Sequence, residues 1–399
     1  MPSIADARTS REPVRMAHLG LGNFHRAHQA WYTQRANTED TADGWGIAAF
    51  TGRSPHAAEV LAAQDGVYSL ITRSAEADTA EIVQSISEAH DGGGAEWERT
   101  LADPAVGVLT VTVTERGYEA EPAESDASGE SAGARIVRGL TARARASAGP
   151  IALVSCDNLN ANGEVLRRTV LREAPGDLRD WIETNASFVS TMVDRITPKT
   201  TDADRATASD LTGYDDETPV VTEPFSEWVV SGDFPAGRPA WDRVGVRFVD
   251  DIEPYERRKL WLLNAGHTLL AAVGLPRGHE TVDQAFADPD CRALLEEQWQ
   301  EARPLLPFDD ATTDASLAAL RSRFANPRIA HRLVQIDDGS LQKLRQRQAE
   351  IISARLDAGE EPGRASLAAI EAWGTSRGFD LPEALDALKP GLARRAYLG

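Results

Sequence analysis

A short apolar run followed by two glycines, near the start of the chain, most constrains the fold. Residues Val14–Leu19 predict a buried strand, and Gly20 and Gly22 follow it directly, ahead of a segment with helical spacing. A strand, a glycine-rich turn and a helix in this order begin a βαβ unit. The first glycine permits a tight turn, and the second lets the backbone approach a pyrophosphate at the helix N-terminus. A tight turn that binds nothing is the alternative, because His25 stands where the usual GxGxxG has its third glycine.

Further apolar segments predict the rest of an α/β domain, with parallel strands buried on both faces. The segments with a strand pattern are residues 46–50, 106–114 and 151–155, and more weakly residues 188–196 and 244–249. After Asp251 the pattern becomes almost entirely helical. A chain of 399 residues is long enough for two cores. We therefore predict an α/β domain over residues 1–252, which carries the candidate dinucleotide-binding turn, and a mostly α-helical domain over residues 253–399, to which the family resemblance described below assigns substrate binding.

The charge balance and the apolar pattern exclude several classes of function. Lysine and arginine total 42 against 62 acidic residues, and the net charge of −20 repels nucleic acid and anionic membranes. No run approaches the roughly 18 apolar residues of a membrane helix, and the first residues lack the apolar stretch of a signal peptide. The two cysteines, Cys156 and Cys291, are too far apart in sequence for a CxxC metal site. We therefore expect a cytoplasmic protein without a disulfide framework and without nucleic-acid or membrane partners.

The end of the second predicted strand bears on the choice of cofactor. An acidic residue there commonly hydrogen-bonds the ribose hydroxyls of NAD, but the segment after the strand is Thr51, Gly52, Arg53 and Ser54. Arg53 is a candidate to face the 2′-phosphate of NADP, and a solvated loop arginine is the alternative. The choice between NAD and NADP therefore stays open from these residues.

The segment from residue 256 to residue 267 concentrates polar side chains on one predicted helix, namely Glu256, Lys259, Asn264 and His267. Carbonyl reduction needs a group that exchanges the hydroxyl proton and donors that hold negative charge on the oxygen. A buried lysine can exchange the proton and an asparagine amide can donate to the oxygen, so no metal is required. On a regular α-helix, His267 would lie ~80° and Asn264 ~140° from Lys259 around the axis. A solvated lysine and ordinary polar packing are the alternatives for these residue types alone.

A second polar cluster follows the strand predicted at residues 151–155. Asp157 and Asn158 stand just beyond its end. Open α/β sheets bind ligands outside the carboxyl ends of their strands, so Asn158 is placed to touch a substrate or a nicotinamide ring. An Asx-type turn ahead of the helix near Glu164 is the alternative interpretation.

Five motifs, in the same order along the chain, resemble those of the polyol-specific long-chain dehydrogenases, which include mannitol 2-dehydrogenase, fructuronate reductase (mannonate oxidoreductase) and tagaturonate reductase. The motifs are GLGNFHRAHQAWY (20–32), SCDNLNANG (155–163), TEPFSEWV (222–229), KLWLLNAGHTLLA (259–271) and RFANPRIAHRLVQIDDGSLQK (323–343). The resemblance implies an extended Rossmann-type domain, a mostly helical second domain, an active site in the cleft between them, and no metal.

The resemblance also implies roles for residues at matching positions. Lys259 would be the general acid/base, and Asn158 and Asn264 would hydrogen-bond the reacting oxygen. His267 would bind a substrate hydroxyl and help to orient the lysine, while Glu256 would assist proton exchange with solvent. The cofactor is expected to be NAD or NADP, with NAD favoured by the resemblance. The residues expected to bind it are Gly20, Gly22, Asn23, Phe24, Arg53 and Asn158.

The last motif is closer to the fructuronate and mannonate reductases than to the mannitol enzymes. His331, Arg332 and Lys343 are candidates to pair with a uronate carboxylate, and helix-surface charge is the alternative. Asp194 matches a family segment near the active site and is a further candidate for substrate binding. The predicted activity is reversible hydride transfer between NAD(P) and a ketose or keto-hexuronate, giving a polyol or an aldonate.

Two other functions stay open. A non-catalytic dinucleotide-binding sensor or scaffold could keep the fold, but it has no need of the lysine, asparagine and histidine spacing. A sugar-phosphate dehydrogenase would need a stronger cationic cluster than Arg257 and Arg258 supply. The chain is shorter than the usual family member, mainly after Lys343, so we expect the helical domain to lack an element. We expect a monomer or small homo-oligomer that acts on a small polyol or sugar acid.

Overall fold

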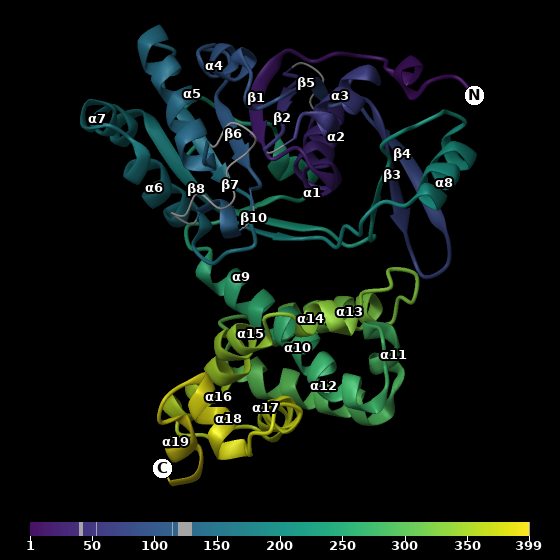
Figure 1. Ribbon diagram of the computed structural model, residues 1–399, viewed down its shortest axis with the longest axis vertical. Coiled ribbons are helices and arrows are strands. Elements are labelled where there is room, and N and C mark those ends of the chain that lie inside the picture. The colour runs from purple at the N-terminus through teal and green to yellow at the C-terminus, as the bar shows by residue number, and fades with distance from the viewer. Residues whose placement is uncertain (40–42, 53, 114, 119–129, 399) are drawn as a thin grey trace. The chain divides into compact units, whose positions relative to one another are not determined.

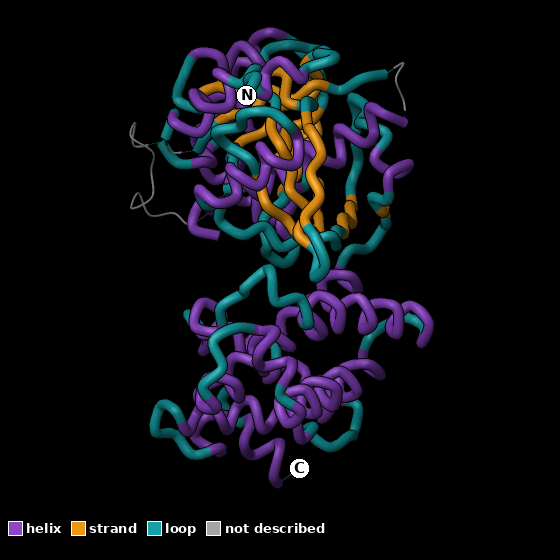
Figure 2. The backbone as a smooth tube through the Cα atoms, turned by 90° about the vertical axis from the view of Figure 1, so that its right-hand side faces the viewer, coloured by secondary structure: helices purple, strands orange, loops and turns teal. Residues whose placement is uncertain are grey.

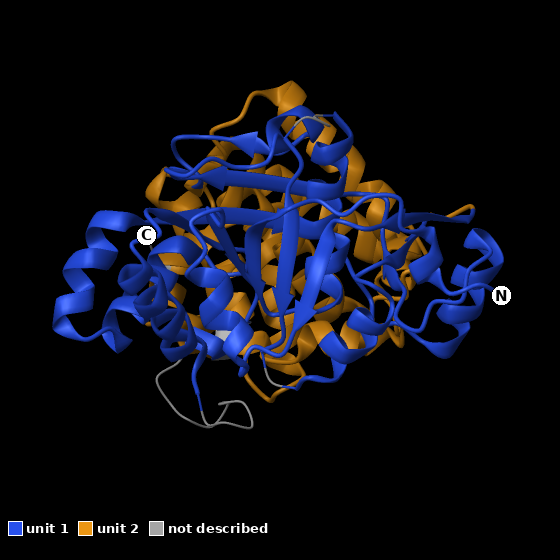
Figure 3. Cartoon of the chain, turned by 90° about the horizontal axis from the view of Figure 1, so that it is seen from above, with its two compact units in different colours: residues 1–73, 77–252 blue, residues 74–76, 253–399 orange. Residues whose placement is uncertain are grey.

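A computed structural model describes residues 1–39, 43–52, 54–113, 115–118 and 130–398 of the protein. The chain forms two compact units, which Figure 3 colours separately. Unit 1 comprises residues 1–73 and 77–252, and unit 2 comprises residues 74–76 and 253–399. In its described part unit 1 combines sheets and helices, whereas unit 2 is built from helices and loops (Figure 2).

All strands of the described residues belong to unit 1, and Figure 1 labels the main elements. The strands are β1 (Val14–Leu19), β2 (Gly46–Phe50), β3 (Tyr68–Arg73), β4 (Asp78–Val83), β5 (Ile86–His90), β6 (Val108–Val111), β7 (Ile151–Ser155), β8 (Ala186–Asp194), β9 (Val220–Thr222), β10 (Glu227–Ser231) and β11 (Arg247–Phe248). The helices of unit 1 are α1 (Asn23–Ala27), α2 (Gln29–Glu39), α3 (His56–Ala63), α4 (Ala95–Leu101), α5 (Ala132–Ala146), α6 (Asn162–Glu173), α7 (Gly176–Asn185) and α8 (Asp202–Thr212), with short 3₁₀ turns η1 (Ile4–Ala7), η2 (Glu115–Tyr118) and η4 (Trp241–Val244).

Unit 2 begins with a nearly continuous helical stretch made of α9 (Glu253–Arg258), the π-helical segment η5 (Lys259–Asn264) and α10 (Ala265–Gly274). The remaining helices of unit 2 are α11 (Val282–Ala287), α12 (Pro289–Ala302), α13 (Asp310–Phe324), α14 (Leu333–Asp337), α15 (Ser340–Gln346), α16 (Gln348–Asp357), α17 (Arg364–Thr375), α18 (Leu381–Leu388) and α19 (Leu392–Leu398), with 3₁₀ turns η6 (Leu275–Arg277) and η7 (Arg303–Leu305). The predicted fold class, a Rossmann-type α/β part followed by a mostly α-helical part, is confirmed.

Among the described residues, eight strands form the main sheet of unit 1, in the order β11-β10-β8-β7-β6-β1-β2-β5. From β8 to β5 neighbouring strands are parallel, while β10 runs antiparallel to β8. Counted along the chain, the parallel strands follow the Rossmann order 3-2-1-4-5-6. The order reverses between β1 and β6, where Leu19 pairs with Val111. These strand ends therefore form the switch point at which open α/β sheets bind ligands.

Alternate residues of the central strands point to opposite faces of the sheet. Met16 belongs to a core that includes Trp31 and other residues of α1–α3, whereas Leu19 belongs to a second core with Leu140 and other residues of α4–α7. Helices cover both faces, so the strands are apolar along their length, as their sequences indicate. The strands predicted on this pattern are confirmed as β1, β2 and β7.

Two predicted strands are shorter in the structure, and a second sheet was not predicted. Within the described part of the run at residues 106–114 the strand is β6 alone; beyond it the hydroxyl of Thr112 donates to the carbonyl of Gly20 at 2.9 Å, and residue 114 lies outside the described residues. The run at residues 244–249 reduces to β11, because Gly245 ends the turn η4 with a φ of +98°. Among the described residues, β4, β3 and β9 form a separate three-stranded sheet.

Two apolar cores hold unit 2 together. The first surrounds α10, where Leu269 and Leu270 pack with Trp299 of α12 and Phe324 of α13. The second lies among α15–α19 and includes Trp373. The helix that carries the candidate catalytic lysine is therefore the centre of a packed core and not a surface appendage.

The cysteines and the helix lengths bear on two further expectations. Cys156 follows β7 in unit 1 and Cys291 lies in α12 of unit 2, and both are buried free thiols. No helix of the described residues has both the length and the apolar character that a membrane crossing requires.

Candidate active site

The turn after β1 can be built only with glycine at position 20. Gly20 has a φ of +108°, and a Cβ atom there would lie 1.9 Å from the carbonyl oxygen of Thr112. The backbone N–H groups of Gly20 and Leu21 both donate to the carbonyl of Phe50, each at 2.9 Å. The turn is thereby fixed between the ends of β1, β2 and β6, at the switch point of the sheet.

Gly22 is constrained differently from Gly20. It precedes α1 with a φ of −147°, an extended conformation that any residue adopts. A Cβ atom at this position would meet only the carbonyl oxygen of Gly20, at 3.6 Å. Packing within the protein does not demand glycine here, which fits a position where a pyrophosphate approaches the backbone.

The neighbouring candidates for cofactor binding also brace the turn. Asn23 Nδ2 donates to Thr200 Oγ1 at 3.2 Å, and Asn23 Oδ1 accepts from Arg26 Nη2 at 2.8 Å. Phe24 is partly buried and packs against the core beneath α1–α3. Arg53, the candidate partner for a 2′-phosphate, lies outside the described residues.

A pair of stacked histidines, which the residue pattern alone does not predict, supports the glycine turn. His25, in the place of the third glycine, stacks on His18 of β1 with ring centroids 3.3 Å apart and planes 8° apart. His18 Nδ1 lies 2.8 Å from Thr110 Oγ1, and His18 Nε2 lies 3.1 Å from Thr112 Oγ1. Thr112 donates in turn to Gly20, so His18 Nε2–H donates to Thr112. Burial lowers the pKa of His18 to about 3 and that of His25 well below 6.5, so both rings are neutral.

Asn158 stands in the loop after β7 and is exposed. Asp157, its neighbour, is buried, and Asp157 Oδ2 accepts hydrogen bonds from Tyr118 OH at 2.6 Å and from the N–H of Val113 at 3.1 Å. The buried Asn162 donates to the carbonyl of Asp157 at 2.8 Å. A braced loop therefore presents Asn158 at the carboxyl edge of the sheet, one strand from the switch point.

Asp194 is the last residue of β8 and is 8% exposed. It pairs across the sheet with Glu227 of β10. The adjacent Arg195 is buried, with its guanidinium 4.2 Å from the centre of the Trp31 ring. Asp194 therefore lies at the same carboxyl edge as Asn158, on the neighbouring strand.

The lysine segment of unit 2 is not a regular α-helix. The π-helical segment η5 begins at Lys259 and ends at Asn264, and the N–H of Ala265 donates to the carbonyl of Leu260, five residues earlier. A π-helical turn takes more residues than an α-helical turn, so Lys259 and Asn264 lie closer together around the axis than on a regular α-helix. The separation of ~140° therefore does not apply here, because it assumes α-helical spacing. π-Helical segments of this kind occur frequently at functional sites.

Glu256 and Lys259 lie three residues apart across the junction of α9 and η5. Glu256 is 9% exposed, and Lys259 is partly buried. Residues three apart on a helix lie on the same side of it, so Glu256 and Lys259 share one side of this helical stretch.

His267 follows Asn264 on α10 and is 7% exposed. Its ring contacts Phe324, with 4.6 Å between centroids, and meets His331 edge to face at 4.8 Å and 72°. The pKa of His267 is lowered well below 6.5, by burial first and then by the basic groups of His331, Arg323 and Arg347. His267 is therefore neutral at pH 7 and can both donate and accept a hydrogen bond with a substrate hydroxyl.

Two cations belong to the surroundings of this helix, and the sequence analysis singled out only one of them. Lys343 of α15 donates to the carbonyl of Ile336 at 2.8 Å, and burial together with Arg347 lowers its pKa. Arg347 lies between α15 and α16, and its Nη1 donates to the carbonyl of Asn264 at 2.9 Å. The one signal for Arg347 in the sequence is its position four residues after Lys343, which is one helical turn.

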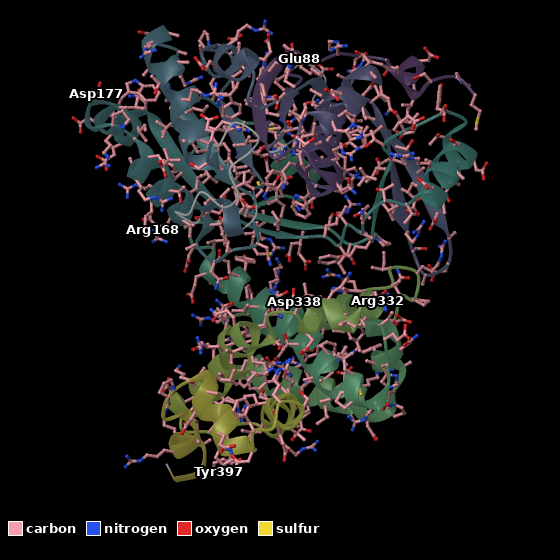
Figure 4. All side chains as sticks on the ribbon, in the orientation of Figure 1. Glu88, Arg168, Asp177, Arg332, Asp338 and Tyr397 are labelled. Atoms are coloured by element: carbon pink, nitrogen blue, oxygen red, sulfur yellow. The ribbon has the colours of Figure 1, made fainter. Side chains whose placement is uncertain are left out.

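Arg332 stands apart from these residues. It precedes α14, and its exposed side chain is labelled in Figure 4. Its Nη2 lies 4.0 Å from Glu280 Oε2, a distance at which an exposed ion pair contributes little.

One group of the described residues has the atoms to ligate a metal ion. The ligand atoms of His279, Asp288 and Cys291 lie within 4.8 Å of one another. Both oxygens of Asp288 are already used, since Oδ1 accepts from the N–H groups of Asp290 and Cys291 and Oδ2 lies 2.9 Å from His279 Nε2. This group caps the start of α12 and contains none of the predicted site residues.

Two family models match the chain. Residues 14–243 match the mannitol dehydrogenase Rossmann domain, and residues 251–373 match the mannitol dehydrogenase C-terminal domain. D-mannonate oxidoreductase of Escherichia coli K12 is 34% identical over 411 residues, which cover 96% of this chain and 84% of that protein. Mannitol 2-dehydrogenase of Pyrenophora tritici-repentis is 32% identical over 395 residues, which cover 92% of this chain and 69% of that protein.

Solved structures agree with this assignment. Mannitol 2-dehydrogenase of Pseudomonas fluorescens, in a ternary complex with NAD and D-mannitol, matches with a TM-score of 0.77 and 32% identity, covering 94% of this chain and 80% of that chain. A D-sorbitol dehydrogenase in substrate-free form shares the fold, with a TM-score of 0.80 and 24% identity over 99% of this chain and 96% of that chain. The matched relatives are named as oxidoreductases or dehydrogenases of polyols and sugar acids. The chain therefore belongs to the mannitol dehydrogenase family of oxidoreductases.

Proposed function

We propose that the protein catalyses reversible hydride transfer between NAD and a sugar-derived substrate, reducing a ketose or keto-hexuronate to a polyol or an aldonate. The observation that carries the proposal is that Lys259 and Asn264 begin and end the π-helical segment η5, with the neutral His267 three residues further on the same helix. An acid/base, an amide donor and a hydroxyl-binding group are thereby held on one rigid element. Such preorganisation is what proton and hydride transfer at a carbonyl require.

The glycine turn of unit 1 supports binding of a dinucleotide. Gly20 permits the turn sterically, and Gly22 leaves the backbone accessible where packing does not need glycine. A dinucleotide held by Gly20, Gly22 and the start of α1 would supply hydride chemistry, as oxidant or as reductant. NAD is preferred to NADP because the solved Pseudomonas fluorescens relative is a complex with NAD.

Lys259 moves the proton that accompanies the hydride. In the oxidising direction its neutral Nζ takes the hydroxyl proton, the hydride leaves the same carbon, and the electrons of the O–H bond form the carbonyl. In the reducing direction the Lys259 ammonium returns the proton to the oxygen. Glu256, three residues before the lysine, relays that proton to or from solvent.

Asn158 and Asn264 hold the charge that develops on the reacting oxygen. Each amide N–H₂ donates to the oxygen as its negative charge grows, so the transition state is stabilised more than the ground state. His267 accepts or donates to a neighbouring hydroxyl and so orients the substrate chain. Asp194, at the carboxyl edge of the sheet beside Asn158, is a further candidate to bind a substrate hydroxyl.

A keto-hexuronate is the favoured substrate class. Lys343 and Arg347 lie around the same helix as Lys259, and Arg323 is among the groups that lower the pKa of His267. The chain as a whole carries a net charge of −20, so an anionic substrate needs such a local group of cations. A carboxylate at one end of the sugar would pair with Lys343, in the positive field of Arg347 and Arg323, while the carbonyl faces Lys259.

The test is a substrate and cofactor panel on the full chain. NADH or NADPH is mixed with fructose, fructuronate or tagaturonate, and the absorbance of the reduced nicotinamide is followed. We expect turnover with NADH and a kcat/KM for a keto-hexuronate roughly tenfold or more above that for fructose, the effect of one charge-assisted pair. Cofactor binding without turnover of any of these sugars would contradict the proposal and support the sensor or scaffold.

A further inference from the structure

We infer that Arg347 is a positioning residue for the proposed active site. Its guanidinium fixes the helix where η5 passes into α10, and its charge acts on the neighbouring His267 and Lys343. This inference rests on the proposed hydride-transfer function, to which it adds a residue outside all five sequence motifs.

The backbone directs Arg347 toward the catalytic helix. α15 ends at Gln346 and α16 begins at Gln348, and between them Arg347 has φ −114° and ψ −88°, which breaks the helix. Its Nη1 donates to the carbonyl of Asn264 at 2.9 Å and to Thr268 Oγ1 at 2.6 Å. The hydroxyl of Thr268 donates in turn to the same carbonyl at 3.1 Å.

The next residue extends the same contact. Gln348 is fully buried, and its Nε2 donates to the carbonyl of Ala265 at 2.8 Å and to Gln298 Oε1 at 3.0 Å. Two consecutive side chains thus hold two consecutive carbonyls, those of Asn264 and Ala265. Holding two adjacent carbonyls fixes the rotation of the helix at the end of η5, and with it the directions of the Asn264 and His267 side chains.

The charge of Arg347 needs its own explanation, because burying an unpaired guanidinium is costly. Among the described residues no ion pair joins Arg347 to a carboxylate, and its Nε is buried without a hydrogen-bond partner. Burial lowers the pKa of Arg347 to about 10, so the group is still protonated at pH 7. A neutral donor such as Gln348 makes equivalent bonds to a carbonyl without this cost. Hydrogen bonding alone therefore does not explain why this position carries a positive charge.

The charge acts on His267. The groups facing His267 are His331, Arg323 and Arg347, and each lowers its pKa after the larger effect of burial. Removing the charge of Arg347 raises the pKa of His267, so a larger fraction of His267 is protonated at a given acidic pH. In the reducing direction Lys259 works as an ammonium, so loss of activity at low pH does not come from the lysine. Arg347 lowers the pKa of His267 but is not among the groups that lower the pKa of His331, so a shift of the low-pH loss on removing Arg347 reports on His267.

The effect of Arg347 on Lys343 can be distinguished from its effect on His267. Burial and then Arg347 lower its pKa, while Asp338 and Asp337 raise it. Without Arg347 the pKa of Lys343 rises, so its ammonium persists to higher pH and can still pair with an anion there. On removal of Arg347, a shift of the acidic limb (the fall of kcat at low pH) therefore comes from His267. A shift of the alkaline limb (the rise of substrate KM at high pH) comes from Lys343.

The test compares Arg347→Met, Arg347→Lys and Gln348→Met in the full-length protein. For Arg347→Met we expect kcat for keto-hexuronate reduction to fall about 10- to 100-fold with a smaller change in KM. The acidic limb of kcat should move upward by roughly half to one pH unit. Arg347→Lys keeps the charge, so it should restore the acidic limb but only part of kcat. Gln348→Met removes a bond without a charge, so it should lower Tm and leave the acidic limb in place.

Two kinetic outcomes overturn the inference when the variants fold. One is a folded Arg347→Met protein with the kcat and acidic limb of the wild type, and the other is an equal shift of the limb in Gln348→Met. If Arg347→Met does not fold, a shifted acidic limb in Arg347→Lys overturns the role of the charge. If the wild type turns over none of the sugars, the proposed function fails. NMR titration of His267 in the same variants then decides, because an unchanged His267 pKa in Arg347→Met overturns the inference independently.

Discussion

The glycine turn of unit 1 and the lysine helix of unit 2 are constrained in different ways. At the turn the constraint is steric, since a Cβ atom on Gly20 would lie 1.9 Å from a carbonyl oxygen. At the lysine helix the constraint is a remote hydrogen bond, since Arg347 donates to the carbonyl of Asn264 from 83 residues further along the chain. A steric constraint requires a glycine at the turn itself, whereas a remote donor requires no particular residue at the carbonyl that it contacts.

The two regions also use histidine differently. His18 and His25 lie flat on one another, both fully buried, and the hydrogen bonds of His18 lead through Thr112 to the backbone of the turn. His267 and His331 meet edge to face, and His267 has 7% of its surface exposed. We therefore expect the first pair to act on stability and the second to act on turnover.

The largest effect should come from Lys259→Ala. Loss of the acid/base should lower kcat by about 10³-fold, within the range for a positioned general acid or base, while the affinity for NADH changes little because the glycine turn is untouched. Steady-state kinetics and NADH fluorescence titration measure the two quantities. Arg257→Ala, which removes a cation from the same helix, is the control and should keep most of the activity. A Lys259→Ala protein with near-normal kcat would remove the lysine from the mechanism.

Gly20→Ala and Gly22→Ala should separate the steric and the ligand-binding roles of the turn. Gly20→Ala forces a Cβ into the Thr112 carbonyl at a positive φ, so the free energy of unfolding should fall by roughly 3 kcal/mol. Gly22→Ala meets only an ordinary contact, so stability should change by less than about 1 kcal/mol while NADH affinity falls about tenfold. Urea unfolding measures the change in stability of each variant, and NADH titration measures the change in its affinity for NADH. Equal losses of stability in the two variants would contradict the distinction.

The buried histidine pair should make unit 1 sensitive to acid. The folded-state pKa of His18 is about 3, below its unfolded value of about 6.5, so the unfolded state binds more protons between these values. The free energy of unfolding should therefore fall as pH decreases from about 6.5, by up to about 1.4 kcal/mol per pH unit for each histidine. His25→Phe keeps a flat ring and should reduce this slope in urea titrations at several pH values. The exposed His56 supplies the control, and an equal reduction in His56→Phe would refute the assignment.

The smallest effect should come from Arg332→Ala. Its exposed side chain is 4.0 Å from Glu280, and such pairs contribute about 0.5 kcal/mol or less, so kcat/KM for fructuronate should change less than about twofold. Lys343→Met removes a partly buried cation beside the catalytic helix and should lower the same kcat/KM about tenfold, with little change for fructose. A larger loss in Arg332→Ala than in Lys343→Met would reverse our placement of the carboxylate-binding group.

Much of the α/β part could be predicted because both faces of its sheet are covered. Residues such as Met16 and Leu19 are buried on opposite faces, and burial on both faces leaves an uninterrupted apolar run. The three-stranded sheet was missed because β4 is half exposed and rich in polar residues, as in its Asp78 and Glu81. Strand ends were also misplaced where a turn took over, as at Thr112 and Gly245.

By itself the sequence determined the two-part α/β and helical fold class, the glycine at position 20, and the set of lysine, asparagine and histidine residues on one helix. These features depend on local sterics, on hydrophobic periodicity and on the order of motifs along the chain. The tertiary structure alone decided that the segment from Lys259 to Asn264 is π-helical, that His25 stacks on His18, and that Arg347 reaches the helix of the candidate lysine. Each of these depends on a contact or a hydrogen-bond register that long-range packing sets, and local residue spacing does not predict such contacts.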